Sequence, residues 1–190
     1  MRLVLIRHGE SEWNAAGRWQ GQGDPSLSAR GREQVARLAE ALAPAGIDVL
    51  VSSDLARAQE TASILSQRLA CPIETDARLR ELDIGRWTGR TRAEIVSRDP
   101  EALRFFETGD RDAHAGAAER RRDVGVRAQA ALREIRARHA GRCVALVTHL
   151  GVLRELLPGR DFDNAEWRSV SAADLSPPPA AAAPVRRAAH

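Results

Sequence analysis

Two arginines and two histidines stand at positions where they could carry out chemistry on a phosphate group. Arg7 and His8 end a short apolar run, His149 ends another, and Arg57 follows a third. Guanidinium groups bind phosphate oxygens bidentately and stay charged at any working pH. A neutral imidazole beside them could attack phosphorus while the other three side chains stabilise the charge on the equatorial oxygens. These four residues therefore indicate phosphoryl transfer, with His8 as the nucleophile, if the fold brings them together.

The elements that must bring them together are buried strands. Residues 3–6, 48–51 and 143–147 are apolar runs that end in polar residues, which is typical of strands covered on both faces. In open α/β sheets, ligands bind where the parallel strands end at their carboxyl side. The sequence therefore predicts an α/β fold in which the ends of these strands lie side by side.

Helices are predicted between the strands. Ser28 is placed to cap a helix that runs to about residue 42, and residues 52–54 form a polar group suited to cap the next helix. Residues 11–23 are rich in glycine and tryptophan and predict a long loop of the kind that serves a site. Residues 72–75 predict an edge strand.

Further helices are predicted in the second half of the chain. Thr91 and Glu94 form a capping box, residues 100–108 show an apolar helical face, and a long periodic stretch covers residues 119–139. Two short helices followed by a long one are therefore expected.

One domain is expected over residues 1–175, and the segment at about 90–115 could form a helical lid in it. Residues 176–190 are rich in proline and alanine and predict a disordered tail. No signal segment and no apolar run of membrane-spanning length is present, which predicts a soluble, cytoplasmic protein without a membrane partner.

The composition excludes several classes of function. All 29 basic residues are arginines, so Schiff-base chemistry and the lysine of a P-loop are excluded. A net charge of +3, with arginines interleaved with acids, argues against a nucleic-acid partner. Cys71 and Cys143 have no second cysteine nearby and are expected to be buried, reduced thiols. The histidines show no ligand spacing, so neither a metal nor another cofactor is expected.

Phosphoryl transfer also needs a proton for the leaving alkoxide. A well-placed carboxyl group contributes ~10²–10⁴-fold to such a step. Glu81 is the best candidate because it lies beside Leu82 and Ile84, in a segment where acidic and apolar residues alternate. Asp83, two positions further on, is the competing candidate.

These residues lie in motifs that resemble those of the histidine phosphatase superfamily, also called phosphoglycerate mutase-like. The resemblance covers residues 2–175. The matching motifs are Arg7-His8-Gly9-Glu10-Ser11 with Asn14, the block 52–61 (SSDLARAQET), Leu79-x-Glu81, Trp87-x-Gly89 and Thr148-His149.

The resemblance implies a three-layer α/β/α sandwich with a mostly parallel central sheet. It implies that His8 is the phosphorylated nucleophile and Glu81 the proton donor. The residues implied to bind phosphate or substrate are Arg7, Ser11, Asn14, Gln20, Arg57, His149 and, through its backbone N–H, Leu150.

The sequence departs from the family pattern in three places. Ser26 stands where relatives usually have a proline, Leu150 replaces the usual glycine after the second histidine, and Ala118-Glu119-Arg120 replaces a Gly-Glu-Ser block. Leu150 keeps a backbone N–H that can still donate to phosphate. The block around Glu119 is expected to alter the wall on the substrate side.

The expected function is that of a metal-independent phosphomonoesterase of the histidine acid phosphatase type, acting on a small phosphorylated metabolite. The short stretch between Glu81 and His149 resembles the compact phosphatases, whereas mutases resemble a longer pattern. A cofactor-dependent phosphoglycerate mutase and an inactive regulatory module that binds a phosphorylated ligand are the alternatives.

The substrate and the oligomeric state are not indicated by the sequence. A sugar phosphate, a phosphoglycerate derivative, a nucleotide-loop phosphate and a phosphoprotein all stay open. Five aromatic residues could line an apolar mouth or pack in the core: Trp13, Trp19, Trp87, Phe105 and Phe106.

Overall fold

A five-stranded sheet forms the centre of the computed structural model, which describes residues 1–171 and 174–175. All neighbouring strands pair in parallel except the last, which is antiparallel to its neighbour at one edge. The order across the sheet is β3 (Ile73–Thr75), β2 (Val49–Ser52), β4 (Cys143–Thr148), β1 (Arg2–Arg7) and β5 (Trp167–Val170). The predicted α/β class and mostly parallel sheet are confirmed, and the predicted tail, 176–190, lies outside the described residues.

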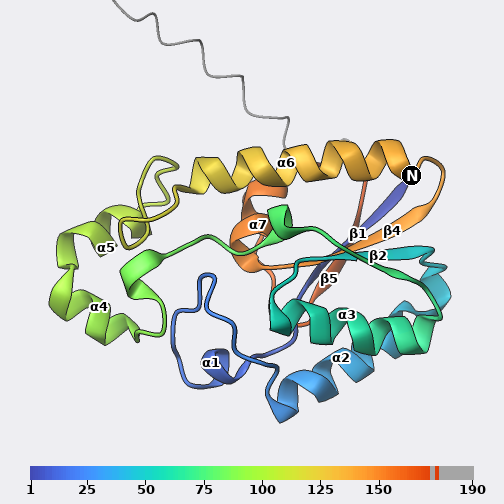
Figure 1. Ribbon diagram of the computed structural model, residues 1–190, viewed down its shortest axis with the longest axis horizontal. Helices are drawn as coiled ribbons and strands as arrows, with labels where there is room; N and C mark the ends of the chain where they lie inside the picture. The colour runs from blue at the N-terminus through green and yellow to red at the C-terminus, as the bar shows by residue number, and fades with distance from the viewer. Residues whose placement is uncertain (172–173, 176–190) are drawn as a thin grey trace, which may run out of the picture.

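Helices cover both faces of the sheet (Figure 1). They are α2 (Ala29–Leu42), α3 (Ala56–Leu69), α6 (Arg121–Arg138) and α7 (Leu150–Leu156). Alternate residues of β1 point to opposite faces: Leu3 and Leu5 pack in the core with α6 and α7, whereas Val4 and Ile6 pack with α2 and α3. The predicted three-layer α/β/α sandwich is therefore confirmed.

The register of β1 and β4 brings the two histidines together. Arg7 lies opposite Thr148, so His8 and His149 leave the sheet as neighbours. The main chain of His8 is bonded on both sides: its N–H donates to the Thr148 carbonyl (3.0 Å), and its carbonyl accepts from the N–H of Ala165 (3.1 Å). The nucleophile candidate is therefore fixed to the centre of the sheet.

The cap of α3 differs from the predicted one. The N-cap residue is Leu55, which makes no side-chain cap, and the N–H of Ala56 donates instead to Oδ1 of Asp24, 2.6 Å away. The prediction that residues 52–54 cap the helix was wrong because the helix begins further along the chain, at Ala56. The loop containing Asp24 is therefore joined to the start of α3.

Other local predictions are confirmed. Ser28 caps α2, since its Oγ accepts a hydrogen bond from the N–H of Gly31 (2.9 Å). The edge strand β3 forms where it was predicted. The loop predicted over residues 11–23 also contains a short helix, α1 (Glu12–Ala15), which begins with a capping box of Ser11 and Asn14.

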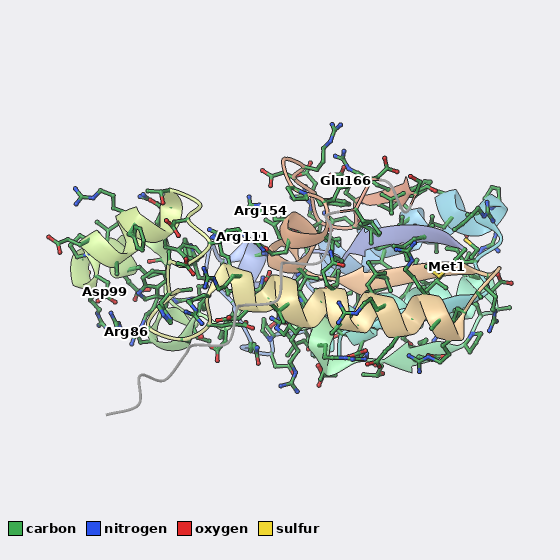
Figure 2. The ribbon with its side chains drawn as sticks, turned by 90° about the horizontal axis from the view of Figure 1, so that it is seen from above. Met1, Arg86, Asp99, Arg111, Arg154 and Glu166 are labelled. Carbon is green, nitrogen blue, oxygen red and sulfur yellow. The ribbon has the colours of Figure 1, made fainter. Side chains whose placement is uncertain are left out.

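Two short helices, α4 and α5, form one end of the molecule (Figures 1 and 2). The remaining helical elements are α4 (Arg92–Arg98), α5 (Pro100–Glu107) and the 3₁₀ helices η1 (Ala43–Ala45), η2 (Ala77–Leu79) and η3 (Gly85–Trp87). The capping box of Thr91 and Glu94 is confirmed. Asp99, between α4 and α5, accepts from Arg86 Nε (2.7 Å) and Trp87 Nε1 (2.8 Å). The two helices exist as predicted, and their action as a lid stays a prediction.

β5 is not predicted from the sequence. Of its four residues only Val170 is buried, so no apolar run marks it. Cys71 and Cys143 are buried free thiols, as expected. Within the described part of the chain, no helix has the length and apolar character needed to cross a bilayer, and no three His, Cys, Asp or Glu side chains gather as a metal site would require.

Candidate active site

The two histidine rings lie next to one another where β1 and β4 end. The ring centroids of His8 and His149 are 5.1 Å apart, and both side chains are buried. Burial lowers the pKa of His8 well below its usual 6.5, and the charges of Arg57 and Arg7 lower it further. Burial, followed by the charge of Arg57, also lowers the pKa of His149 well below 6.5. Both imidazoles are therefore neutral at neutral pH.

One contact decides which nitrogen of His8 holds the proton. Nδ1 lies 2.7 Å from the backbone carbonyl oxygen of Gly9. Because a carbonyl oxygen can only accept, Nδ1 carries the single proton of the neutral ring and donates it. Gly9 is itself held by Thr61, whose Oγ1 accepts from the Gly9 N–H (3.1 Å). Nε2 of His8 therefore keeps its lone pair, as a nucleophile requires.

Arg7 and Arg57 are held by backbone carbonyls. Arg57 donates from Nη1 to Gly23 (2.7 Å) and from Nη2 to Gly21 (2.8 Å), and Arg7 donates from Nη1 to Phe162 (2.7 Å). Burial lowers the pKa of Arg57 to about 10 and also lowers that of Arg7, and both guanidinium groups stay charged at neutral pH. Because neutral carbonyls do not cancel these charges, the site attracts an anion.

Unpaired polar atoms gather at the same place. In the described part of the chain, the buried side-chain polar atoms without a hydrogen-bond partner are Nε of Arg7, Arg57 and Arg121, and Nδ1 of His139 and His149. Leaving one such group unpaired costs about 1–3 kcal/mol. Because Arg7, Arg57 and His149 all lie beside His8, their unpaired nitrogens form a group of donors suited to an anionic ligand.

A cavity of about 300 Å³ opens beside these side chains. This volume is at the lower end of the range of ~300–1,000 Å³ that is typical of small-molecule pockets. The predicted site residues that line it are Arg7, Asn14, Gln20, Arg57, Glu81 and Leu150. His8 and His149 are buried next to Arg7 and Arg57 and do not themselves line the cavity.

Aromatic residues divide between the cavity and the core. Trp19 and Phe106 line the cavity, and their rings also contact each other, with centroids 5.9 Å apart. Trp87 is buried in the core, whereas Phe105 is half exposed. The apolar wall of the cavity is therefore built by only part of the predicted aromatic set, together with Leu82 and Ile84.

Ser11 lies behind the cavity wall. It is fully buried, and its Oγ donates to Oε1 of Gln20 (2.7 Å). Asn164, which the sequence did not single out, donates from Nδ2 to the His8 carbonyl (3.2 Å) and to Oδ1 of Asn14 (3.3 Å). Ser11 and Asn164 thus hold residues of the wall, and direct contact of Ser11 with substrate stays a prediction.

Glu81 is the carboxyl group that faces the cavity. Both of its side-chain oxygens accept from the N–H of Gly151 (3.1 and 3.2 Å), and Oε1 also accepts from the N–H of Leu82 (2.8 Å). Asp83, the competing candidate, does not line the cavity, and its Oδ1 accepts from the N–H of Gly85 (2.9 Å). The geometry therefore favours Glu81 over Asp83 as a proton donor.

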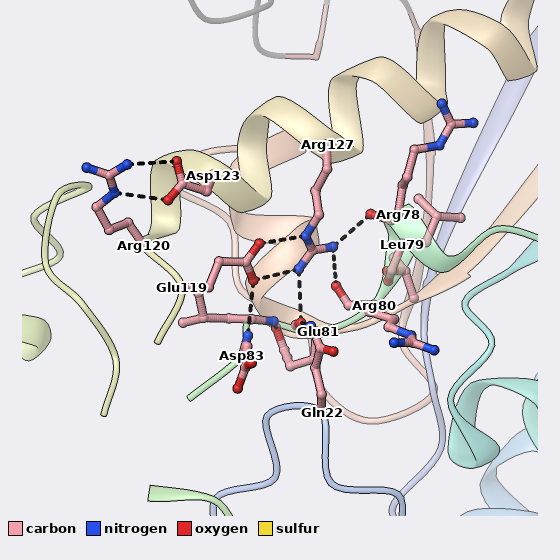
Figure 3. Close-up of polar contacts among 12 residues, drawn as sticks. Gln22, Arg78, Leu79, Arg80, Glu81, Asp83, Glu119, Arg120, Asp123 and Arg127 are labelled. Carbon is pink, nitrogen blue, oxygen red and sulfur yellow. Dashed lines mark hydrogen bonds and ion pairs between the residues drawn. The ribbon is translucent and has the colours of Figure 1, made fainter. Parts of the chain in front are cut away.

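A partly buried ion pair holds the segment that carries Glu81 (Figure 3). Arg127, on α6, donates from Nε and Nη2 to the two carboxylate oxygens of Glu119 (2.8 and 3.0 Å). The same guanidinium donates to the backbone carbonyls of residues 78, 80 and 81 (2.7, 2.5 and 2.9 Å). Glu119 also accepts from the N–H of Asp83 (3.0 Å). The backbone on both sides of Glu81 is therefore fixed to α6.

Glu119 does not lie in the cavity wall, where the sequence had placed the altered block. The altered block around it was predicted to change the wall on the substrate side, but Glu119 does not line the cavity. It lies behind the wall as the partner of Arg127. The effect of this block on the cavity is therefore indirect, through the backbone at residues 81–83.

The chain is similar to known proteins over most of its length. It is 40% identical over 173 residues to the glucosyl-3-phosphoglycerate phosphatase of Mycolicibacterium vanbaalenii, covering 86% of this chain and 76% of that one. It is 36% identical over 149 residues to the probable phosphoglycerate mutase GpmB of an Enterobacter species, covering 78% and 69%. Among solved structures, that of the mycobacterial glucosyl-3-phosphoglycerate phosphatase with VO3 is similar with a TM-score of 0.81 and 34% identity, covering 90% of each chain.

A family model covers nearly the whole described chain. It matches residues 3–176 and describes the histidine phosphatase superfamily, branch 1. The fold, the two histidines at neighbouring strand ends and the similar proteins all agree with this match. The chain therefore belongs to the histidine phosphatase superfamily (branch 1).

Proposed function

We propose that the protein is a phosphomonoesterase that hydrolyses a small phosphorylated metabolite through a phosphohistidine at His8. The observation that carries the proposal is the state of the His8 ring, which is neutral, has its proton on Nδ1 and keeps a lone pair on Nε2. Unpaired donors of Arg7 and Arg57 lie beside it. The similarity to a named phosphatase supports the same reaction class.

In the first step, the lone pair of His8 Nε2 forms a bond to phosphorus while the ester P–O bond breaks. Arg7, Arg57 and His149 stabilise the charge on the equatorial oxygens. His149 Nε2 lies 2.9 Å from the Ser53 hydroxyl oxygen. In the tautomer that the mechanism uses, Ser53 donates to Nε2, and Nδ1 carries the proton that His149 donates to a phosphate oxygen. The protonated carboxyl of Glu81 gives its proton to the leaving oxygen, so that an alcohol departs.

In the second step, water completes the hydrolysis. The Glu81 carboxylate takes a proton from a water molecule, and the water oxygen forms a bond to phosphorus. The N–P bond breaks, its electron pair returns to His8 Nε2, and inorganic phosphate leaves. Both steps use only groups of this chain, and Glu81 and His8 end in their starting states.

Hydrolysis of p-nitrophenyl phosphate in the presence of EDTA tests the proposal. We expect activity that vanadate inhibits and that His8→Ala abolishes. A labelled substrate should leave an acid-labile, base-stable phosphoryl group on the protein, as expected for phosphohistidine. A fully active His8→Ala variant would refute the mechanism. Phosphate binding without hydrolysis by the unaltered protein would favour the inactive binding module.

A phosphoglycerate mutase is the second candidate, because a probable mutase is among the similar proteins. A mutase would return the phosphoryl group from His8 to a second hydroxyl of the substrate instead of to water. Incubation with 3-phosphoglycerate separates the two reactions. Release of inorganic phosphate supports the phosphatase, whereas formation of 2-phosphoglycerate without phosphate release supports the mutase.

A further inference from the structure

The chain contains two asparagines, Asn14 and Asn164, and their side chains bond to each other although they are 150 positions apart. Nδ2 of Asn164 donates to Oδ1 of Asn14 (3.3 Å) and to the backbone carbonyl of His8 (3.2 Å). Asn14 lines the cavity, whereas Asn164 does not. One amide group behind the wall therefore bridges the main chain of the proposed nucleophile and a residue of the wall.

The turn that carries Asn164 is fixed to the end of β1 by its main chain. The N–H of Ala165 donates to the His8 carbonyl (3.1 Å). The carbonyl of Glu166 accepts from the N–H of Arg7 (3.0 Å). Because these bonds do not involve the Asn164 side chain, a change of that side chain can remove the bridge and leave the turn in place.

The bridge also determines which way the Asn14 amide faces. Oδ1 of Asn14 accepts from the N–H of Ser11 (3.1 Å) and from Nδ2 of Asn164. An amide nitrogen cannot accept from such donors, so the oxygen must face them. Within the described residues, Nδ2 of Asn14 has no acceptor. Its two N–H groups are therefore available to an anion in the cavity.

We propose that Asn164 is a positioning residue for phosphoryl transfer. Its amide keeps the Asn14 amide turned with Nδ2 toward the ligand, and it ties this orientation to the main chain of His8. The inference rests on the phosphatase function proposed above, in which His8 attacks phosphorus. A donor that is oriented before the reaction needs no rearrangement when charge develops on the phosphoryl oxygens, and such preorganisation lowers the barrier.

The side-chain amide signals of the unaltered protein test the bridge. Labelling with ¹⁵N-asparagine gives two pairs of side-chain N–H signals, because the chain has two asparagines, and Asn14→Ala identifies the pair that belongs to Asn14. We expect the Asn164 protons to exchange with solvent at least ~10 times more slowly than the Asn14 protons, because both Asn164 protons are hydrogen-bonded. Vanadate should slow the exchange of the Asn14 pair and shift its signals more than those of Asn164.

Substitution of Asn164 tests its part in turnover. Asn164→Asp keeps the shape of the side chain but replaces its two donors by acceptors, which oppose the His8 carbonyl and Oδ1 of Asn14. Asn164→Ala leaves the Asn14 amide held by Ser11 alone. We expect Asn164→Asp to lower kcat/KM for p-nitrophenyl phosphate about 10- to 100-fold more than Asn164→Ala does.

A double-mutant cycle shows whether Asn164 acts through Asn14. In an Asn14→Ala background, the excess loss caused by Asn164→Asp over Asn164→Ala should be at least ~5 times smaller, because the residue that transmits the effect is absent. Any loss that comes from the added negative charge alone persists in both backgrounds. A purely structural role of Asn164 would instead lower stability equally in both backgrounds and would not produce this difference in turnover.

Asp163→Ala is the matched control. Asp163 is adjacent to Asn164 and exposed, and its carboxylate makes no hydrogen bond within the described part of the chain. Turnover and vanadate inhibition should therefore stay as in the unaltered protein. Equal losses of turnover in Asp163→Ala and Asn164→Ala would overturn the specific role of Asn164.

The outcomes separate this inference from the function on which it rests. Equal exchange rates of the two amide pairs, or an undiminished excess loss in the Asn14→Ala background, would overturn the positioning role. Absence of p-nitrophenyl phosphate hydrolysis by the unaltered protein would instead refute the phosphatase function. The exchange measurement needs no substitution of Asn164, so it decides the question even if Asn164→Asp folds poorly.

Discussion

The backbone N–H of Gly151 donates to both carboxylate oxygens of Glu81, at 3.1 and 3.2 Å. A Cβ atom at position 151 would overlap Oε1 of Glu81. Only glycine therefore leaves room for the carboxylate in this position. His149 is the N-cap residue of α7, and Gly151 lies in the first turn of the same helix. The proposed acid and the proposed phosphate site are therefore built on the same helix end.

Gly151→Ala should displace the Glu81 carboxylate from the cavity. We expect turnover of an alkyl phosphate to fall about 10- to 100-fold, and that of an aryl phosphate much less, because a good leaving group needs less protonation. In a Glu81→Gln background, Gly151→Ala should cause little further loss of turnover, because both substitutions affect the same proton transfer. Steady-state rates on the alkyl and aryl esters measure these losses. Equal losses on both esters, or fully additive losses, would contradict the assignment.

Removing the Arg127 guanidinium should release the backbone around Glu81. We expect Arg127→Gln to lower the free energy of unfolding by about 3 kcal/mol, because it leaves Glu119 unpaired in a partly buried place. Alkyl phosphate turnover should fall more than aryl phosphate turnover, and Arg127→Lys should recover part of it. Urea unfolding and rates on both esters provide the measurements.

Arg120→Gln is the control for Arg127→Gln. Arg120 forms an ion pair with Asp123 on the surface of the same helix (2.9 Å; Figure 3). Exposed pairs of this kind contribute at most about 1 kcal/mol, so stability and the ratio of the two rates should barely change. If Arg120→Gln and Arg127→Gln gave the same ratio of alkyl to aryl phosphate turnover, the positioning role of Arg127 would be refuted.

The Asp24 cap should affect both stability and anion binding. Asp24→Ala removes the acceptor for the N–H of Ala56, and loss of such a cap costs about 1 kcal/mol. It should also weaken inhibition by vanadate, because Arg57 is in the first turn of α3 and is bonded to the neighbouring carbonyl of Gly23. Asp24→Asn keeps an acceptor and should preserve most of the stability. Thermal melts measure the first effect, and vanadate inhibition constants measure the second. If Asp24→Ala changed neither the melting temperature nor the inhibition constant, the predicted role of the cap would be wrong.

The stability of the fold should fall as the pH drops below 6.5. The pKa values of His8 and His149 lie well below 6.5 in the folded protein, so below pH 6.5 the unfolded chain binds more protons. The contribution of the two neutral rings to the free energy of unfolding is fully present above pH 6.5 and is lost as the pH falls. At pH 5.5 the loss should be about 1 kcal/mol per histidine.

Urea unfolding at pH 7.5 and 5.5 measures this dependence. His149→Asn should lose about half of it, because one of the two titrating rings is removed. His114→Asn, which changes an exposed histidine, should retain all of it. Equal stability of the unaltered protein at both pH values would show that the two rings are not kept neutral by burial.

The parts of the site that follow from local patterns could be predicted. Arg7, His8 and His149 were found because each ends an apolar run, and the ends of parallel strands meet at one edge of a sheet. Glu81 and Arg57 were found because their neighbours in sequence form recognisable blocks. In each case the information lies within a few residues of the candidate side chain.

The parts that depend on contacts between distant segments could not be predicted. Arg127 looks like one more surface arginine of a helix, yet it bonds to carbonyls 46 to 49 positions earlier in the chain. Asp24 caps a helix 32 positions later. Nothing in the periodicity of either segment marks such partners, and the same holds for Asn164 at the His8 carbonyl.

The main chain of His8 is bonded to β4 on one side and to Ala165 on the other. Its amide can therefore exchange with deuterium only when the central sheet opens, which places it among the last amides to exchange. The proposed nucleophile thus belongs to the same cooperative unit as the core. Denaturant should therefore abolish turnover and unfold the sheet in a single transition, without an inactive state that keeps the sheet intact.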